Sequence, residues 1–414
     1  MQGFRWIVSQ IGARQHYGVP RGFHYQGNLR RFYTESWCRR GSSVLKYGSA
    51  KLKAFAGRYS PDLPSERVVS FTARTEWDRL RYSKSESHTL SQRYEEFLRF
   101  GKVFSKWVTK DLAAQPLDPT RDMFFGFNTG CLETLEMLRD RGVLTIVDQI
   151  DPARMEEDLV YEESKRWPGW QKATGRVPEE YFKRLSAEWA LADLVVVNSE
   201  WSRQALVAQG VPREKQIVVP VAYEPTGIQF KLRPQKKGPL TVLWIGSVNL
   251  RKGIPYLMEA AEMLRRSDIR FVVAGPLEIS ESAVRSAPAN VSFLGRLTRG
   301  ETSKHYRSAD LFVLPTISDG FAITQVEAMA HGLPVITTPN CGQVVTPGID
   351  GIIVPARDSR ALAEAIARLD ADRQLLCEMS RQALATAHTF QLPSQAAQIE
   401  KAVRRLRPRS VDSL

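Results

Sequence analysis

The stretch Asp319-Gly-Phe-Ala-Ile-Thr-Gln-Val-Glu327-Ala-Met-Ala-His-Gly-Leu-Pro-Val335 carries the strongest structural signal in the sequence. It follows an apolar run that ends at Pro315 and predicts a strand, and its own pattern predicts a helix that begins near Ile323. Gly320 lets the backbone approach a ligand closely, and the free amides of residues 321–324 lie at the positive end of the helix dipole. The stretch therefore predicts an anion site that suits phosphate.

Two carboxylates frame this stretch, one before the predicted helix at Asp319 and one inside it at Glu327. They cannot both serve a phosphate, but a carboxylate is a strong acceptor for the paired hydroxyl groups of a sugar. Alternatively, Asp319 only caps the helix and Glu327 is a solvated helix residue. Because the complete string is present, we favour the sugar-binding interpretation.

A second turn, Gly246-Ser-Val-Asn-Leu-Arg-Lys-Gly253, leaves a predicted strand at 240–245 and enters a predicted helix. Its glycine and the adjacent cations Arg251 and Lys252 suit a diphosphate, although such a sequence is also common in solvated turns. Both turns follow strands of one predicted sheet, and ligands of open α/β sheets bind beyond the carboxyl ends of the strands. Their agreement predicts a single diphosphate site.

Short apolar strands alternate with helical stretches, which predicts an α/β fold with parallel sheets covered by helices. In the second half the predicted strands are residues 240–245, 269–274, 291–294, 311–314, 334–337 and 352–354. The first half is less regular, with candidate strands at 4–9, 68–72, 123–127, 144–147 and 194–198. A segment rich in Pro, Gly and Lys between 220 and 239 is typical of an interdomain linker. We therefore expect two doubly wound domains, residues 1–225 and 236–390, with a cleft between them.

The composition excludes several protein classes. Hydrophobic residues make up 43% of the 414 residues, enough for two or three folded domains, and no apolar run approaches the roughly 18–20 residues of a membrane span. Four cysteines, at 38, 131, 341 and 377, have no metal-binding or redox spacing, and residues 1–10 lack the apolar core of a secretory signal. We therefore expect a cytoplasmic protein with reduced thiols.

The positive charge is concentrated at the N-terminal end. Residues 1–110 hold 21 Lys and Arg against 8 Asp and Glu, whereas the rest of the chain holds 37 of each kind. This distribution indicates an anionic partner, such as acidic lipid, a phosphorylated acceptor or nucleic acid, or else ordinary solvated basic faces. The segment contains no recognisable RNA-binding signature, so nucleic acid is the least favoured of these partners.

These motifs closely resemble those of the retaining glycosyltransferases of family 4, which have the GT-B fold of two Rossmann-like domains facing a central cleft. The resemblance covers residues 190–370 well and residues 1–190 poorly. The strings that carry it are residues 192–199, 217–220, 246–254, 272–276, 291–297, 309–315, 319–335 and 348–355. It also implies that a C-terminal helix, at about 391–407, returns to the first domain.

The resemblance implies a role for each residue of the two turns. Lys252 would bind the diphosphate of a nucleotide sugar, Glu327 would hold its ribose hydroxyls, and Asp319 would face the donor sugar. The phosphate turn would use Gly246, Ser247 and Arg251, the phosphate cradle would use Gly320, Phe321, Ala322, Ile323 and Thr324, and the base pocket would use Pro276, Arg296 and Leu297.

Two positions depart from the family pattern. The family usually has Glu where this chain has Asp319, and it often has Arg where this chain has Ser247. Arg251 is the neighbouring cation available to replace the missing arginine. Either change is compatible with a different donor sugar or with lost activity.

No metal-binding cluster stands out in the sequence, so we expect a transferase that needs no metal ion and no cofactor. The resemblance implies retention at the anomeric carbon. Asp148 stands near the position where many relatives have a catalytic histidine, and it either replaces that residue or caps a turn. In the first loop Arg14, His16 and Tyr17 would meet the acceptor, unless they are ordinary loop residues.

We expect a sugar to be transferred to a glycan, glycolipid or other anionic acceptor in cell-surface polysaccharide or lipopolysaccharide synthesis. Residues 1–110 would contact an acidic membrane, and residues 44–59 form a candidate interfacial helix unless that helix faces the core. Two other functions remain open: a sugar-nucleotide epimerase of the same fold, or a non-catalytic protein that binds a membrane or nucleic acid.

Overall fold

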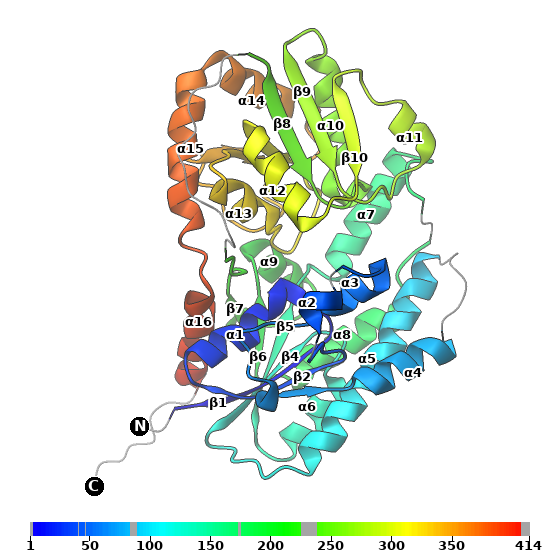
Figure 1. Cartoon of the computed structure of the whole chain (residues 1–414), viewed down its shortest axis with the longest axis vertical. Coiled ribbons are helices and arrows are strands. Elements are labelled where there is room, and N and C mark those ends of the chain that lie inside the picture. Colours follow the sequence, from blue (N-terminus) through cyan, green and yellow to red (C-terminus); the bar gives the residue numbers. More distant parts are fainter. Residues whose placement is uncertain are drawn as a thin grey trace.

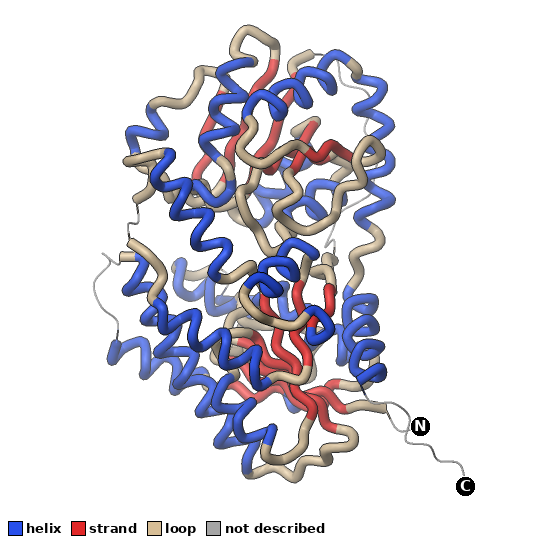
Figure 2. The backbone as a smooth tube through the Cα atoms, turned by 180° about the vertical axis from the view of Figure 1, so that it is seen from behind, coloured by secondary structure: helices blue, strands red, loops and turns tan. Residues whose placement is uncertain are grey.

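The computed structural model describes residues 3–39, 41–45, 47–82, 89–172, 175–224 and 238–406. Within them the chain forms two parallel β-sheets that follow each other along the long axis of the molecule (Figure 1). Helices flank both sides of each sheet, as the view from behind shows (Figure 2). The prediction of two doubly wound α/β domains is confirmed, while most of the predicted linker, residues 225–237, lies outside the described residues.

The first sheet has seven parallel strands in the order β3-β2-β1-β4-β5-β6-β7. They are β1 (Arg5–Gln10), β2 (Leu29–Thr34), β3 (Val68–Ser70), β4 (Asp122–Phe127), β5 (Leu144–Gln149), β6 (Leu194–Val197) and β7 (Gln216–Val218). From β1 the chain first moves outward to β3 and then returns to the other side of β1 at β4. Because helices cover both faces, the central strands are apolar on both, and Trp6, Phe124 and Val195 are fully buried.

The second sheet has six parallel strands in the order β10-β9-β8-β11-β12-β13. They are β8 (Leu240–Ile245), β9 (Ile269–Ala274), β10 (Val291–Gly295), β11 (Leu311–Leu314), β12 (Val335–Thr337) and β13 (Gly351–Ile353). Each predicted strand of this half agrees with an observed strand to within one residue at either end. The strands of this half could be predicted because they are short apolar runs next to glycine or proline.

The helices of the first domain are α1 (Gly18–Tyr25), α2 (Ser42–Leu45), α3 (Ala50–Ala56), α4 (Thr72–Tyr82), α5 (Leu90–Ala113), α6 (Leu132–Arg139), α7 (Arg154–Arg166), α8 (Glu179–Leu191) and α9 (Glu200–Ala208). Those that follow are α10 (Ile254–Met263), α11 (Glu281–Arg285), α12 (Arg299–Ser308), α13 (Thr324–Ala330), α14 (Ser359–Ala371), α15 (Arg373–Ala387) and α16 (Leu392–Leu406). Short 3₁₀ turns are η1 (Arg14–Tyr17), η2 (Ser65–Arg67), η3 (Arg213–Lys215) and η4 (Leu250–Lys252).

Helix α16 lies beside α1 on the first domain (Figure 1). Its apolar residues Ala396, Ile399 and Val403 are buried in the same core cluster as Trp6 and Phe23. A Cβ on Gly22 of α1 would lie 3.0 Å from the Cβ of Ala396, so glycine there allows the two helices to approach closely. The C-terminal segment therefore returns from the second sheet to the first.

The candidate interfacial helix at 44–59 is wrong as a single element. Its residues divide between α2, which ends at Leu45, and α3, which begins at Ala50, and the Ser49 hydroxyl caps the second helix. Residue Lys46, between the two helices, lies outside the described residues. Val44 and Leu52 are exposed, so neither belongs to the packed core.

Candidate functional site

The carboxyl ends of four neighbouring strands, β10, β9, β8 and β11, meet at one edge of the second sheet. A predicted donor-binding residue follows each strand: Arg296 follows β10, Pro276 follows β9, Gly246 follows β8 and Asp319 follows β11. Pro276 and Leu297 are half-buried and Arg296 is exposed. The structure therefore places the predicted base-binding residues toward the outer strand and the predicted phosphate-binding residues near the middle of the sheet.

The turn that carries the two cations is held tightly by the backbone around it. Asn249 caps η4, because its Oδ1 accepts a hydrogen bond of 3.1 Å from the Lys252 N–H. Gly253 follows with φ of 72°, and a Cβ there would lie 1.7 Å from the carbonyl oxygen of Pro315. Only glycine fits this position, so the direction of the Lys252 side chain is set by packing.

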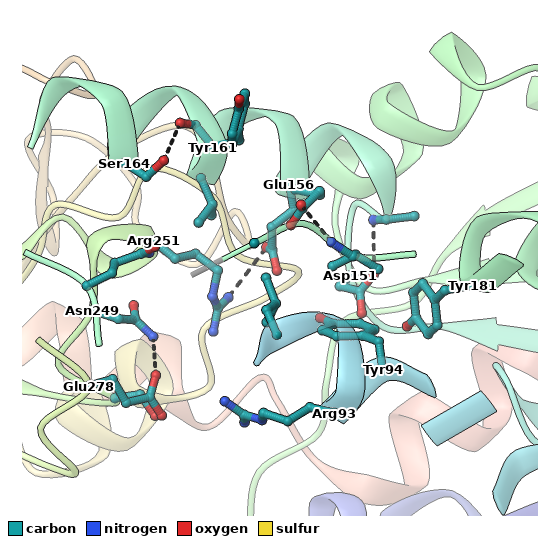
Figure 3. A pocket seen from close by; sticks show the side chains of 18 of the residues that line it. Arg93, Tyr94, Asp151, Glu156, Tyr161, Ser164, Tyr181, Asn249, Arg251 and Glu278 are labelled. Carbon is teal, nitrogen blue, oxygen red and sulfur yellow. Dashed lines mark hydrogen bonds and ion pairs between the residues drawn. The ribbon is translucent and has the colours of Figure 1, made fainter. Parts of the chain in front are cut away.

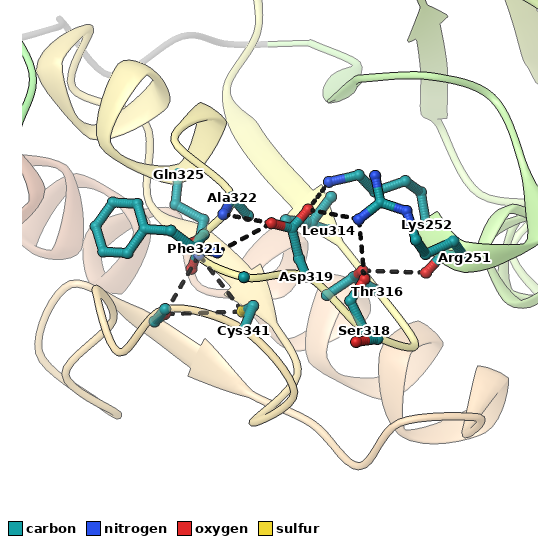
Figure 4. A network of polar contacts seen from close by, with 12 residues as sticks. Arg251, Lys252, Leu314, Thr316, Ser318, Asp319, Phe321, Ala322, Gln325 and Cys341 are labelled. Carbon is teal, nitrogen blue, oxygen red and sulfur yellow. Dashed lines mark hydrogen bonds and ion pairs between the residues drawn. The ribbon is translucent and has the colours of Figure 1, made fainter. Parts of the chain in front are cut away.

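The carboxylate of Asp319 lies at the centre of a polar network beside this turn (Figure 4). Its Oδ1 accepts hydrogen bonds from the N–H groups of Phe321 at 3.0 Å and Ala322 at 2.7 Å. Its Oδ2 forms an ion pair with the Lys252 ammonium and lies 3.4 Å from the Arg251 guanidinium. The amides and cations predicted to bind phosphate are thus together in space, and a carboxylate of the chain itself occupies them.

Lys252 and Asp319 are each only 9% exposed, so their charges interact strongly. Burial and the neighbouring Arg251 guanidinium lower the pKa of Lys252. The Glu156 carboxylate acts on the pKa in the opposite direction, because a nearby negative charge favours the ammonium form. The Asp319 carboxylate thus lies beside both cations of the turn.

Two further predicted residues lie on α13 beside the network. The hydroxyl oxygen of Thr324 is buried and makes no hydrogen bond within the described part of the chain. Glu327 is half-buried, and one of its carboxylate oxygens accepts a hydrogen bond of 3.0 Å from the Tyr306 hydroxyl on α12. Tyr306 thereby orients the Glu327 carboxylate.

Gly320 makes a close backbone contact with the first domain. A Cβ at this position would lie 1.9 Å from the carbonyl oxygen of Ile150 in the first domain. Its own carbonyl accepts a hydrogen bond of 3.5 Å from the Ser202 hydroxyl on α9. The glycine therefore allows the two domains to approach each other, and the close contact is with protein.

A cavity of about 610 Å³ lies between the domains at this point (Figure 3). From the second domain it is lined by the turns that follow β8 and β11, including Ser247, Arg251 and Asp319. From the first domain it is lined by aromatic side chains of α5, α7 and α8, which are Tyr94, Phe97, Tyr161, Tyr181 and Phe182. A ligand in the cavity would contact both domains at once.

Glu156 on α7 is a residue of this site that sequence reasoning missed. Its carboxylate lies 3.4 Å from the Arg251 guanidinium and accepts a hydrogen bond of 3.1 Å from the Ser318 hydroxyl. Trp201 on α9 donates to the same hydroxyl oxygen at 3.1 Å. Burial raises the pKa of Glu156, and nothing in the acidic sequence around it indicated a contact with the second domain.

Asp148 lies near the end of β5, 5% exposed, and its carboxylate makes no hydrogen bond within the described residues. Burial raises its pKa to about 7, although the Arg14 guanidinium acts in the opposite direction. Arg14 itself donates a hydrogen bond of 3.1 Å to Asn128. A carboxyl group in this state can hold or release a proton near neutral pH.

The first loop does not line the cavity between the domains. It forms η1, where Gln15, His16 and Tyr17 all have positive φ values near 50–60°. Tyr17 is 1% exposed, and its ring packs edge-on against Phe32 and Trp37, so it belongs to the core. His16 is exposed.

The described residues include no group of three His, Cys, Asp or Glu side chains placed to hold a metal ion. None of the described helices combines the length and the apolarity that crossing a bilayer requires.

Comparison with known proteins bears on this site directly. Residues 239–372 match the family model described as glycosyl transferases group 1, and all of the predicted donor-binding residues lie inside the match. This part of the chain is therefore a glycosyl transferases group 1 domain.

A curated relative is the amylovoran biosynthesis glycosyltransferase AmsK of Erwinia amylovora, which is 27% identical over 207 residues. That match covers 46% of this chain and 51% of AmsK, so the chain spans about half the length of this relative.

Two solved structures share the fold over almost the whole chain. Sucrose-phosphate synthase from Thermosynechococcus elongatus has a TM-score of 0.63 at 18% identity, covering 97% of this chain and 99% of its own. Anabaena Alr3699/HepE, solved in complex with UDP and glucose, has a TM-score of 0.60 at 14% identity, covering 97% and 100%. The expected GT-B architecture is confirmed.

Proposed function

We propose that this chain is a retaining glycosyltransferase that moves a sugar from a nucleoside diphosphate sugar to a glycan or glycolipid acceptor. The observation that carries the proposal is the buried cluster of Lys252, Arg251 and the amides of Phe321 and Ala322, which lies in the group 1 domain and binds a carboxylate already. A site built for one anion at this edge of an open sheet suits the donor diphosphate.

The donor would lie along the edge of the second sheet. Its diphosphate would contact Lys252, Arg251 and the Thr324 hydroxyl, which has no other partner among the described residues. Its ribose would use the carboxylate of Glu327 that Tyr306 orients, and its base would lie beside Pro276 and Arg296-Leu297. UDP is the first nucleotide to test, because Alr3699/HepE was solved with it.

The acceptor would enter the cavity between the domains. Aromatic side chains such as Tyr94, Tyr161 and Tyr181 suit the apolar faces of a sugar ring, and the neighbouring carboxylates suit its hydroxyl groups. The name of AmsK, from amylovoran biosynthesis, supports a polysaccharide setting.

In the proposed reaction, the acceptor hydroxyl attacks the anomeric carbon on the face from which the diphosphate leaves. The bond from the anomeric carbon to the phosphate oxygen breaks, the new glycosidic bond forms, and the acceptor proton passes to the leaving diphosphate. Lys252, Arg251 and the loop amides stabilise the charge on the diphosphate, so no metal ion is required. Asp148, which does not line the cavity itself and whose pKa burial raises to about 7, is proposed as the residue that assists on the acceptor side.

A second proposal concerns where the acceptor is found: α4 contacts an anionic membrane. On its outer face Trp77 and Leu80 are 68% and 80% exposed, and Arg74 and Arg81 are exposed beside them. Residues three and four apart share one face of a helix, so these four side chains form a short amphipathic surface of aromatic, aliphatic and basic groups. Acidic lipid is the partner that matches both the apolar side chains and the excess positive charge of residues 1–110.

The donor site is tested by thermal unfolding with UDP, GDP, ADP and their sugars. A ligand at 100 times its Kd adds about 2.7 kcal/mol of stability, which a melting curve detects readily. We expect a stabilising nucleotide for the parent and a lost or strongly reduced shift for Lys252→Ala and Glu327→Ala.

The exposed residues Lys304 and Glu364 supply matched controls, and Lys304→Ala and Glu364→Ala should respond like the parent. If all five proteins respond alike, the site assignment is wrong. Transfer of the donor sugar to an added glycan, rather than isomerisation of the donor, separates a transferase from an epimerase.

A further inference from the structure

The Asp319 carboxylate makes the contacts that a bound anion would make. It accepts from the two adjacent amides of Phe321 and Ala322 and is paired with the Lys252 ammonium and the Arg251 guanidinium. Apart from Arg251, which also contacts Glu156 and the Ser318 carbonyl, no other acceptor for these groups is recorded among the described residues.

The amides of Phe321 and Ala322 both donate to one oxygen of the Asp319 carboxylate, so they point to the same place. Ala322 has φ of 60°, the left-handed region that residues other than glycine seldom occupy. Successive N–H groups that converge in this way form a concave anion-binding nest. Backbone strain of this kind persists where the surrounding structure over-determines it, and it concentrates at functional sites. The nest is therefore a built feature, and Asp319 fills it.

The charges of the cluster also require an anion at this point. Lys252 and Arg251 are consecutive, and Lys252 is 9% exposed. Without Asp319, two neighbouring cations would share Glu156 as their acidic partner. A site that held no anion between donor-binding events would be costly to keep folded, because unpaired buried charges are unfavourable.

We propose that the Asp319 carboxylate occupies the donor phosphate position while no donor is bound and stabilises the site in that state. When a diphosphate binds, the side chain turns out of the nest. This inference rests on the proposed donor site. A side chain can leave by rotation about its own bonds, so no domain movement is needed. Once displaced, the carboxylate lies beside the donor, where it can accept hydrogen bonds from the donor sugar.

The length of the side chain matters for this device. An aspartate reaches amides two and three residues ahead of it, as in other Asx-type turns. A glutamate is one methylene longer and carries its carboxylate past the amide pair. Asp319→Glu therefore keeps the negative charge near Lys252 but does not close the nest.

Occupancy of the nest by Asp319 lowers the affinity of the parent protein for nucleotide, because only the fraction of molecules with an open nest can bind. Calorimetric titration with UDP and with inorganic pyrophosphate tests this. We expect Asp319→Asn to lower both dissociation constants at least about tenfold, since the competing charge is removed. Asp319→Glu should give a smaller gain, and it keeps the test decisive if the asparagine variant does not fold.

Two controls separate the device from a general change of charge. Glu156→Gln removes a negative charge from the same cluster but not the one that occupies the nest, and should improve binding less than Asp319→Asn. Asp158→Asn, on the exposed side of α7, should change nothing.

If the parent binds UDP and neither Asp319 variant binds it more tightly, self-occupancy is wrong while the donor site stands. If neither the parent nor the variants bind UDP, GDP, ADP or pyrophosphate, the proposed donor site and the device are both wrong.

Discussion

Asp148 is buried in the first domain, and its ionisation should be visible in the stability of the protein. Its pKa is about 7 in the folded chain and near 4 when the chain is unfolded. Between these values the folded state binds the extra proton, so the free energy of unfolding falls as pH rises from about 4 to about 7 and is then level. Each pKa unit corresponds to about 1.4 kcal/mol, so the total effect is a few kcal/mol.

Asp148→Asn should therefore be more stable than the parent at pH 8 and differ little from it at pH 4.5, by urea unfolding. Glu188, whose pKa burial also raises to about 7, contributes the same trend in both proteins and cancels in the comparison. Asp140→Asn, an exposed substitution, is the control. A parent that is stabilised relative to Asp148→Asn at pH 8 would contradict the assignment.

At the scale of single residues, the sequence predicted which side chains of the second domain lie together, but not which side chains of the first domain contact them. Lys252, Arg251 and Asp319 could be predicted because their strand-to-turn context is local. The contact between Asp319 and the amides of its own loop was predicted only by the alternative interpretation, in which Asp319 caps the helix. Glu156 could not be predicted, since its role depends on how α7 meets a loop 162 residues away.

Helix α4 is the element whose proposed role can be tested separately from catalysis. We expect the protein to sediment with vesicles of phosphatidylcholine containing about one third phosphatidylglycerol, and less at high salt, because lipid charge contributes. The double variant Trp77→Ser, Leu80→Ser should reduce the bound fraction severalfold, because it removes the apolar side chains that the membrane would bury.

Met263→Ser provides the matched control, since Met263 is 57% exposed on α10 of the second domain. It should sediment like the parent. A parent that stays in the supernatant at low salt, or a double variant that binds as well as the parent, would contradict the proposal for α4.

The strands of the second half were predictable because each is a short apolar run with a glycine or proline at one end or both. Those of the first half were harder. Strand β2 begins Leu-Arg-Arg, and its arginines pair with Asp122 and Asp111 on other elements, so the run does not look apolar. The long helix α5 was not among the predicted elements.

At the scale of the whole molecule, α7 links the two domains. It lies between the first domain and the base of the second sheet (Figure 1), with Glu156 near Arg251 at one end. Toward its other end the buried carboxylate of Glu163 accepts from the Tyr256 hydroxyl at 2.7 Å and pairs with Arg357 at 2.6 Å. The turn of Arg251 and the contacts of Tyr256 and Arg357 therefore all meet one helix, a relation that no local sequence pattern carries.

The central claim is that a donor diphosphate binds at the Lys252 corner of the second domain. A crystal structure of the protein with the nucleoside diphosphate that stabilises it most tests this directly. We predict diphosphate oxygens within hydrogen-bond distance of the Lys252 ammonium and of the Phe321 and Ala322 amides, with the Asp319 carboxylate turned away. Nucleotide density elsewhere, with Asp319 still on those amides, would contradict the account.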